Sequence, residues 1–329
     1  MKRLAVIGGG AWGTALATVI ARAGGEPVLW TRDPGVAAAI NEHAENPVYL
    51  PGIALDPPIA ATSDLAESVA DAEGLLLAVP AQFLRGVLTN LAPCLLPGVP
   101  LLLCAKGIET VSLKTMSELS AELAPNAPLA VLSGPSFAAE VARKLPTAVV
   151  IASRDAALSE IFAAALGAPR FRPYVSTDPV GVEIGGAVKN VMAIACGIVE
   201  GVRLGDNARA ALITRGLAEL VRLGIAKGGV ADTFRGLSGV GDLVLTCNAA
   251  QSRNYSLGVA LGRGAGLPEA LAGRRGIVEG VATAAAIREL AARLAVEMPI
   301  CAAVDAVLHR GVVVRDIVEQ LLSRPFRAE

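Results

Sequence analysis

Short aliphatic runs alternate with amphipathic segments along the first half of the chain. The runs are continuously apolar, as expected for strands of a sheet that is buried on both faces. The predicted strands span residues 3–7, 27–30, 74–79, 100–104, 129–132 and 148–152. The predicted helices span residues 11–23, 64–70, 82–91, 114–123 and 136–143. This alternation predicts an α/β fold, with a doubly wound, Rossmann-type parallel sheet covered by helices on both faces.

The second half of the chain has a different pattern, in which helical periodicity dominates and strand signals are scarce. Asp178 and Pro179 are typical of a helix start, with the aspartate as N-cap and the proline in the first turn. Further helices are predicted over residues 180–202, 207–226, 281–294, 302–309 and 314–322. We therefore expect a dinucleotide-binding domain over residues 1–177 and an all-α C-terminal domain, carrying substrate and catalytic groups, over residues 178–329.

A glycine-rich loop joins the first predicted strand to the first predicted helix. Gly8, Gly10 and Gly13 have the GxGxxG spacing of a dinucleotide-binding turn. In such a turn the first glycine permits the tight bend, the second lets a pyrophosphate approach the backbone, and the third lets the helix pack on the strand. The helix N-terminus then offers free N–H groups to the phosphates. The alternative is a glycine turn without a ligand.

The end of the second predicted strand bears on cofactor choice. NAD-binding folds usually place an acidic residue there for the ribose hydroxyls, but Arg32 comes first in this chain and Asp33 follows it. A guanidinium suits a 2′-phosphate. We expect NADPH to be preferred and NAD to remain usable. The alternative is that Arg32 is a solvated loop residue.

The high hydrophobic content could indicate a membrane protein, but the positions of glycines and prolines argue against it. Hydrophobic residues make up 53% of the 329 residues, and residues 4–21 and 86–105 carry no charged side chain. Glycines interrupt the first stretch and prolines the second, so neither predicts a membrane span. The apolar run before Gly8 is too short for a signal peptide, which predicts a cytoplasmic protein.

Charge and cysteine usage exclude other classes. The formal net charge is −1, which argues against a nucleic-acid-binding protein. Five scattered cysteines and two histidines predict neither a metal site nor a disulfide framework.

Two lysines stand in apolar surroundings. Lys106 follows an aliphatic run at the carboxyl end of a predicted parallel strand, where ligands bind in such sheets. Lys189 lies within a nearly all-apolar helical segment, where an ammonium must be paired or have a lowered pKa. A desolvated lysine is a competent acid or base, although a lysine at a helix edge can also extend its ammonium to solvent.

Two further groups complete the candidate set. Asp242 follows three glycines in an apolar stretch and is a plausible partner for a buried lysine or a substrate hydroxyl. Ser252, Arg253 and Asn254 form a compact set of donors suited to a phosphate, or alternatively a polar helix cap.

These groups stand in an ordered series of motifs. In the first half the motifs are Gly8-x-Gly10-x-Trp12-Gly13-Thr14-Ala15, Asn46-Pro47-x-Tyr49-Leu50-Pro51-Gly52, Ala78-Val79-Pro80, Lys106-Gly107-Ile108-Glu109 and Ser133-Gly134-Pro135-Ser136-Phe137-Ala138. In the second half they are Lys189-Asn190-Val191, the run from Asn207 to Gly216, Gly239-x-Gly241-Asp242-Leu243, Ser252-Arg253-Asn254 and Val278-Glu279-Gly280. Along nearly its whole length the chain resembles the bacterial NAD(P)-dependent glycerol-3-phosphate dehydrogenases.

The resemblance implies a reversible reaction between dihydroxyacetone phosphate and sn-glycerol 3-phosphate with NADP or NAD, feeding glycerophospholipid synthesis. It implies that Lys189 is the proton-transferring catalytic residue. The implied substrate-binding residues are Lys106, Gly134, Ser136, Lys189, Asp242, Ser252, Arg253 and Asn254. The implied cofactor-binding residues are Gly8, Gly10, Ala11, Trp12, Gly13, Arg32, Tyr49, Lys106, Ala138, Arg253, Val278 and Glu279.

The resemblance also implies a homodimer formed through the helical domain and a small phosphorylated triose or polyol as substrate. Arg209 and Arg215 lie in a matched motif, and we expect them to be structural, paired across a domain or subunit interface. The chain departs from the family at Ala11, where serine is frequent and can bind the pyrophosphate.

Two other functions remain open from the sequence. One is a 3-hydroxyacid dehydrogenase or ketopantoate-type reductase, which has the same architecture and a lysine but lacks the Ser252-Arg253-Asn254 phosphate set. The other is a redox-sensing regulator that binds NADPH without catalysis, against which Lys189 and Asp242 argue.

Overall fold

The N-terminal half of the chain forms one eight-stranded sheet. The computed structural model describes residues 1–274 and 276–323. The strands are β1 (Arg3–Ile7), β2 (Glu26–Trp30), β3 (Ala60–Thr62), β4 (Gly74–Leu77), β5 (Leu101–Leu103), β6 (Leu129–Ser133), β7 (Thr147–Ala152) and β8 (Phe171–Ser176). Their order across the sheet is β3-β2-β1-β4-β5-β6-β7-β8. Strands β1 to β3 follow one another toward one edge of the sheet, and β4 to β8 follow one another toward the other edge. The order therefore switches between β1 and β4, and a dinucleotide binds at the carboxyl ends of the strands at such a switch point.

Helices cover the sheet, and those of the first half are α1 (Ala11–Arg22), α2 (Pro34–His43), α3 (Leu65–Val69), α4 (Leu84–Leu91), α5 (Met116–Leu123), α6 (Ala138–Ala142) and α7 (Ala156–Leu166). Two short turns of 3₁₀ helix, η1 (Ala81–Phe83) and η2 (Ala92–Cys94), flank α4. Two separate hydrophobic clusters pack on the sheet, one with α1 and α2 and the other with α4 and α5. The expected doubly wound, Rossmann-type architecture is therefore confirmed.

The prediction of a fully parallel sheet is wrong at one pair. β6 and β7 run antiparallel, whereas every other neighbouring pair of strands is parallel. Between them the chain forms only the five-residue helix α6, which rises about 7.5 Å and is too short to return along the sheet. The chain therefore enters β7 at the end of the sheet where it left β6.

The hydrophobic pattern also missed several elements. β3 has only three residues, and β8 contains Pro173 and exposed side chains, because both are edge strands. Helices α2 and α7 were not predicted either, although Asp33 and Asp155 cap their first turns.

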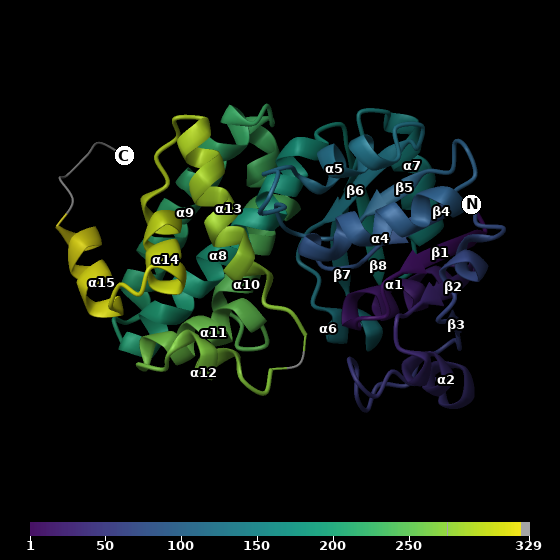
Figure 1. Ribbon diagram of the computed structural model, residues 1–329, viewed down its shortest axis with the longest axis horizontal. Helices are drawn as coiled ribbons and strands as arrows, with labels where there is room; N and C mark the ends of the chain where they lie inside the picture. The colour runs from purple at the N-terminus through teal and green to yellow at the C-terminus, as the bar shows by residue number, and fades with distance from the viewer. Residues whose placement is uncertain (275, 324–329) are drawn as a thin grey trace.

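The second half is helical, as expected (Figure 1). Its helices are α8 (Pro179–Val202), α9 (Asp206–Ala226), α10 (Asp242–Asn248), α11 (Arg253–Gly262), α12 (Leu267–Leu271), α13 (Glu279–Arg293), α14 (Pro299–His309) and α15 (Val314–Leu322), with short turns η3 (Ala231–Arg235) and η4 (Leu237–Gly241) before α10. Sequence reasoning did not find α10, α11 and α12. The expected domain division at 177/178 stays a prediction; β8 ends at Ser176 and α8 begins at Pro179.

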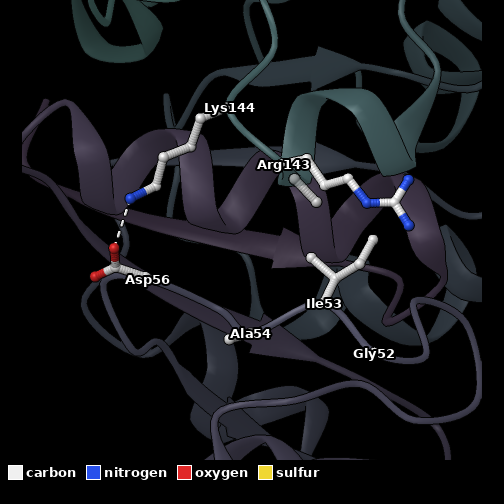
Figure 2. A pocket seen from close by; sticks show the side chains of 7 residues that line it. Gly52, Ile53, Ala54, Asp56, Arg143 and Lys144 are labelled. Atoms are coloured by element: carbon white, nitrogen blue, oxygen red, sulfur yellow. Dashed lines mark hydrogen bonds and ion pairs between the residues drawn. The ribbon is translucent and has the colours of Figure 1, made fainter.

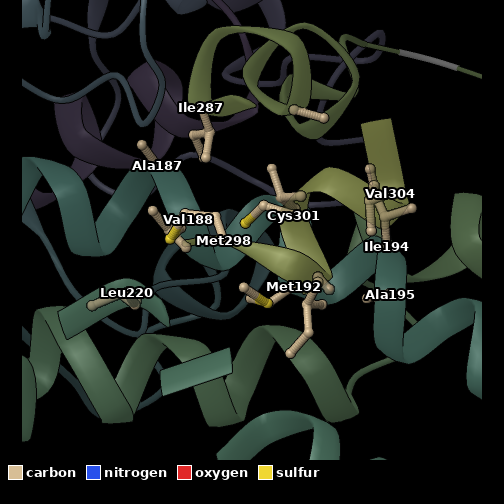
Figure 3. Close-up of a cluster of buried hydrophobic side chains, with 14 of the residues drawn as sticks. Ala187, Val188, Met192, Ile194, Ala195, Leu220, Ile287, Met298, Cys301 and Val304 are labelled. Atoms are coloured by element: carbon tan, nitrogen blue, oxygen red, sulfur yellow. The ribbon is translucent and has the colours of Figure 1, made fainter. Parts of the chain in front are cut away.

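Helix α8 is the central helix of the second half. Helices α9, α10, α11, α13 and α14 pack around it, and its apolar side chains form one cluster with theirs (Figure 3). By length and composition α8 could cross a membrane, but its most apolar 18-residue window is entirely buried within the protein. A core helix of this kind passes the same compositional test, so α8 is weak evidence for a membrane span.

The N-terminus of α8 is fastened to both halves of the chain. Asp178 caps the helix by accepting from the Gly181 N–H at 2.9 Å, and its other oxygen accepts from the Val230 N–H at 2.8 Å. One turn later the Glu183 carboxyl accepts from the Ser117 N–H at 2.8 Å, at the start of α5 in the sheet domain. Burial raises the pKa of Glu183 to about 7.

Helices α8 and α11 cross at backbone contact. A Cβ placed on Gly258 would lie 2.1 Å from the Ile194 carbonyl oxygen, and one on Gly197 would lie 2.0 Å from the Tyr255 carbonyl oxygen. Gly201 and Gly262 repeat this close approach one turn further on. The spacing of the two helices, and with it the position of Arg253 at the start of α11, therefore depends on glycine.

We expect Gly258→Ala to lower the free energy of unfolding by about 3 kcal/mol, because an overpacked crossing must separate. The matched control is Gly86→Ala on α4, where an added Cβ meets no atom within 4 Å. Alanine should be neutral or stabilising there, since its helix propensity exceeds that of glycine. Urea unfolding of both variants measures the difference, and equal midpoints would contradict the proposed contact.

Candidate active site

The glycine loop has the geometry that its spacing predicts. Gly8 has a φ of +124°, and a Cβ there would lie 2.9 Å from the backbone of Ala78 at the end of β4. A Cβ on Gly13 would lie 1.9 Å from the Gly8 carbonyl oxygen, so α1 packs directly on the loop. Gly10 is the N-cap of α1, and a Cβ there would meet no atom within 4 Å. The side of the loop that a pyrophosphate would approach is therefore open.

Asn46 joins this loop to the segment that carries Tyr49, a role that sequence reasoning did not assign. Its side-chain amide is fully buried and donates to the Gly9 carbonyl at 2.9 Å and to the Thr14 hydroxyl at 2.8 Å. Its carbonyl oxygen accepts from the Tyr49 N–H at 3.1 Å. Tyr49 itself is 40% exposed.

The residues after β2 have separate tasks. The Asp33 carboxylate accepts from the Gly35 N–H at 2.8 Å and is the N-cap of α2. Asp33 therefore has a structural role at the start of α2, which the sequence alone did not assign to it. Arg32 is exposed at the carboxyl end of the strand, where the adenosine side of a dinucleotide lies in this fold.

Three charged groups from distant parts of the chain meet at the junction of the two domains. The Lys189 ammonium, on α8, lies 2.7 Å from Asp242 Oδ1, and the Lys106 ammonium, after β5, lies 2.8 Å from Asp242 Oδ2. The Asp242 side chain is 1% exposed. Thr246, one turn along α10, accepts from the Lys189 ammonium at 2.9 Å. The sequence made Asp242 a plausible partner for a buried lysine, and the structure pairs it with the buried Lys189 and also with the partly buried Lys106.

Burial and charge shift the pKa values within this cluster. Burial lowers the pKa of Lys189 to about 8, with Asp242 opposing the shift and the Lys106 ammonium adding to it. Burial would raise the pKa of Asp242, but the two ammoniums outweigh it and hold that pKa below its usual value. One carboxylate shared by two ammoniums leaves an excess positive charge, which suits an anionic ligand.

Gly134 and Ser136 complete the surroundings of Lys106. The Lys106 ammonium donates to the Gly134 carbonyl at 2.8 Å, and the Ser136 hydroxyl lies 3.5 Å away. Gly134 follows β6 with a φ of +123°, where a Cβ would lie 3.1 Å from Val149. Because β5 and β6 are parallel, the 134–136 loop and Lys106 leave their strands at the same end of the sheet.

Side-chain amides connect Lys106 to the helical domain. The Asn190 amide donates to the Lys106 carbonyl at 3.0 Å, and the Asn254 amide donates to Asn190 Oδ1 at 2.9 Å. Asn254 Oδ1 in turn accepts from the Gly280 N–H at 2.9 Å. Two contacts of Asn254 are thus structural, and one amide hydrogen remains for a ligand.

Ser252 and Arg253 have different surroundings. The Ser252 hydroxyl accepts from the Tyr255 N–H at 3.2 Å and caps α11, which is the helix-cap alternative seen in the sequence. Arg253 as a residue is exposed, and partial desolvation of its guanidinium lowers its pKa, with the Glu279 carboxyl opposing the shift. A Cβ on Gly276 would lie 2.4 Å from Arg253 Nη1, so the Gly276 backbone lies against the guanidinium.

The remaining predicted cofactor residues stand at the starts of helices α1, α6 and α13. Ala11 and Trp12 begin α1, Ala138 begins α6, which packs against α1, and Val278 is the N-cap of α13. Glu279 Oε1 accepts from the Ala81 N–H at 3.1 Å, and burial raises the pKa of Glu279 to about 7.

Two buried polar atoms in this set lack a partner among the described residues. They are Trp12 Nε1, a donor, and Glu279 Oε2, which accepts when ionised. Buried polar groups are nearly always satisfied in folded proteins, and a bound ligand is one way in which these two atoms would gain a partner. With the open face of Gly10, they fit a dinucleotide that lies along the start of α1 and reaches the domain junction.

Family models match both halves of the chain. The model for the N-terminus of NAD-dependent glycerol-3-phosphate dehydrogenase matches residues 3–159, and the model for the C-terminus of the same enzyme matches residues 178–319. The chain belongs to the NAD-dependent glycerol-3-phosphate dehydrogenase family. The resemblance drawn from the sequence motifs is thereby confirmed.

Relatives in this family cover the whole chain. The glycerol-3-phosphate dehydrogenase [NAD(P)+] of Rhodospirillum rubrum is 59% identical, over 100% of this chain and 94% of its own length. That of Caulobacter vibrioides is 55% identical, over 100% and 99%. The crystal structure of glycerol-3-phosphate dehydrogenase from Coxiella burnetii has a TM-score of 0.94 at 39% identity, covering 98% of this chain and 99% of that one.

The architecture is shared more widely than the family. A ketopantoate reductase from Ralstonia eutropha has a TM-score of 0.57 at 18% identity, covering 97% of this chain and 99% of that one. This likeness shows the fold alone. It explains why the order of elements left a ketopantoate-type reductase open, and the family models now favour the dehydrogenase.

Arg209 is paired within its own domain. Its guanidinium binds Glu200 Oε2 at 2.8 Å and also contacts Asp206. The structural role expected of Arg209 therefore needs no interface, whereas Arg215 is exposed on α9.

A surface hollow of about 310 Å³ is formed by residues outside the predicted site (Figure 2). It is lined by Gly52, Ile53, Ala54, Asp56, Ala142, Arg143 and Lys144, none of which belongs to the predicted site.

Proposed function

We propose that this protein interconverts dihydroxyacetone phosphate and sn-glycerol 3-phosphate with NADP or NAD, and so supplies the backbone of glycerophospholipids. The observation that carries the proposal is the buried cluster of Lys189, Asp242 and Lys106 beside an open glycine loop. The cluster combines a lysine whose pKa lies near neutrality, and which can act as acid or base, with positive charge that can bind an anion. The names of the family relatives support the same reaction.

Lys189 moves the proton. When the cofactor is bound, its nicotinamide supplies or accepts the hydride at C2 of the substrate. During reduction the Lys189 ammonium stabilises the developing oxyanion and protonates it. During oxidation the Lys189 amine takes the hydroxyl proton. A pKa of about 8 keeps both protonation states accessible near neutral pH.

The groups around Lys189 bind and orient. Asp242 and Thr246 fix the direction of the Lys189 ammonium through bonds of 2.7 and 2.9 Å. Arg253 and the free amide hydrogen of Asn254 anchor the substrate phosphate, with the remaining contacts from Lys106, Gly134, Ser136 and Ser252. Anchoring the phosphate presents C2 to the hydride and lowers the entropic cost of the encounter.

Cofactor contacts come from Gly8, Gly10, Ala11, Trp12, Gly13, Arg32, Tyr49, Lys106, Ala138, Arg253, Val278 and Glu279. Compartment and assembly rest on sequence reasoning and resemblance: we place the enzyme in the cytoplasm, as a homodimer formed through the helical domain. Its small-molecule partner is its substrate, a small phosphorylated triose or polyol.

We expect Lys189→Ala to lower turnover by about 10²–10⁴-fold, because the proton donor is lost. The assay follows NADPH oxidation by absorbance with dihydroxyacetone phosphate as substrate. Cofactor binding, measured by NADPH fluorescence, should survive because the glycine loop is untouched. Turnover within a few fold of the unmodified enzyme would exclude Lys189 as the acid/base.

Arg253→Ala should raise the KM for dihydroxyacetone phosphate by about 100-fold, since a charge-assisted anchor for the phosphate is removed. Arg263→Ala, an exposed arginine at the other end of α11, is the matched control and should leave KM unchanged. An unchanged KM in Arg253→Ala would remove the phosphate role.

Cofactor preference tests the role of Arg32. We expect a higher kcat/KM with NADPH than with NADH, and we expect Arg32→Ala to lower the NADPH value about tenfold while changing the NADH value little. Steady-state kinetics with both cofactors measures this. A clear preference of the unmodified enzyme for NADH would contradict the assignment.

A further inference from the structure

The segment that carries Lys106 has no regular helix or strand of its own. It leaves β5 at Leu103 and reaches α5 at Met116, and most of its backbone bonds lie outside any helix or strand ladder. A lysine side chain has many rotamers, so the placement of its ammonium on Asp242 depends on what holds this backbone. The Asn190 amide holds the Lys106 carbonyl itself. A second set of contacts holds the turn that follows.

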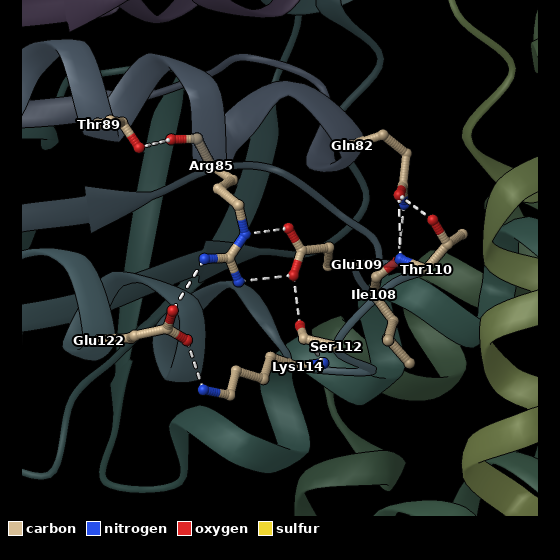
Figure 4. A network of polar contacts seen from close by, with 9 residues as sticks. All are labelled: Gln82, Arg85, Thr89, Ile108, Glu109, Thr110, Ser112, Lys114 and Glu122. Atoms are coloured by element: carbon tan, nitrogen blue, oxygen red, sulfur yellow. Dashed lines mark hydrogen bonds and ion pairs between the residues drawn. The ribbon is translucent and has the colours of Figure 1, made fainter.

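A buried carboxylate lies at the centre of that turn. Glu109 accepts from Arg85 Nε at 2.7 Å and from Arg85 Nη2 at 2.9 Å, in a two-bond contact (Figure 4). The Ser112 hydroxyl also donates to Glu109 Oε2. The Glu109 side chain is only 6% exposed. Two-bond contacts between arginine and carboxylate fix geometry as well as charge.

Gln82 holds the backbone on either side of Glu109. Its amide donates to the Ile108 carbonyl at 2.7 Å, and its carbonyl oxygen accepts from the Thr110 N–H at 3.1 Å (Figure 4). Three consecutive residues of the turn are therefore bonded to side chains from η1 and α4. The turn is attached to that element rather than to β5 or α5 alone.

The same element also contacts the cofactor region. Ala81, next to Gln82, donates its N–H to Glu279. A Cβ on Gly107 would lie 2.7 Å from the Ala81 Cβ and 3.3 Å from Glu279 Oε2, so the turn is pressed against both. A shift of the turn thus cannot occur without a shift at Lys106 or at Glu279.

We propose that Glu109 is a positioning residue: fastened to Arg85, its carboxylate holds the 107–113 turn on α4 and thereby keeps the Lys106 ammonium on Asp242. This inference rests on the proposed function for its kinetic readout. Arg85 lowers the pKa of Glu109, so the carboxylate is ionised at neutral pH. Neither Glu109 nor Arg85 bonds to Lys106, Lys189 or Asp242, so any effect on the reaction passes through the backbone.

The test is Glu109→Gln, which keeps the side-chain shape and removes the charge. We expect the KM for dihydroxyacetone phosphate to rise about tenfold, because a displaced Lys106 weakens substrate positioning. The matched control is Glu122→Gln, the same substitution at the other carboxylate bound by Arg85, at 2.8 Å on α5. Glu122 also binds the Lys114 ammonium, directly after the turn, but it bonds to no residue of the 107–113 turn itself, so this variant should stay within twofold of the unmodified enzyme.

A second readout separates positioning from general loss of stability. Lys189 faces three titratable groups, Asp242, Lys106 and the Cys247 thiol, and the Lys106 ammonium lowers its pKa. If Lys106 leaves Asp242, the pKa of Lys189 rises. The alkaline limb of kcat/KM for reduction should then move up by about one pH unit in Glu109→Gln and not in Glu122→Gln.

Gln82→Ala gives an independent variant at a partly exposed position. It leaves the Arg85–Glu109 pair intact and should move KM and the alkaline limb in the same direction by smaller amounts. The proposal is overturned if folded Glu109→Gln matches Glu122→Gln in both readouts. It is also overturned if Glu109→Gln fails to fold and Gln82→Ala shifts neither. Failure of the proposed function is distinct, since the unmodified enzyme would then not reduce dihydroxyacetone phosphate at all.

Discussion

One buried carboxylate shared by two ammoniums is the interaction on which the rest of the site depends. Asp242 binds Lys106 of the sheet domain and Lys189 of the helical domain at 2.8 and 2.7 Å. Buried charges are costly unless they are paired and hydrogen-bonded, so the two domains must pack in the arrangement that brings these three side chains together. The arrangement leaves one uncompensated positive charge, and an anionic substrate completes the balance. Binding and domain packing therefore satisfy the same electrostatic requirement.

The sequence predicted those parts of the fold in which local pattern and tertiary environment agree. The glycine loop, the buried parallel strands and the long apolar helix α8 all have strong local signals. The signals fail at the edges of the sheet, where β8 contains Pro173 and exposed side chains. The antiparallel direction of β7 was missed because strand direction depends on the length of the connection, which hydrophobicity does not record.

For the site, the sequence identified residues of suitable chemistry but not which residues they contact. Lys189 in an apolar helix and Asp242 after three glycines were recognised because an isolated charge in such a setting needs a partner. Thr246, Asn190 and Asn46 were assigned no role, since their contacts are with residues 57, 84 and 37 positions away. The α8–α10 packing brings Thr246 to Lys189, the domain junction brings Asn190 to Lys106, and the fold of the sheet domain brings Asn46 to the glycine loop. Asp33 was ambiguous until its bond to the Gly35 N–H showed it capping α2.

The anchoring of α8 at its first two turns has a mechanical consequence. Asp178 fastens the helix start to the 230–233 segment, and Glu183 fastens it to α5 of the sheet domain. Lys189 lies six residues beyond Glu183, about 9 Å along a stiff helix. The Lys189 ammonium is thus carried on a short helical segment whose start is bonded to both domains. A relative movement of the two domains would therefore have to break the contact between Glu183 and Ser117, close to the reacting group.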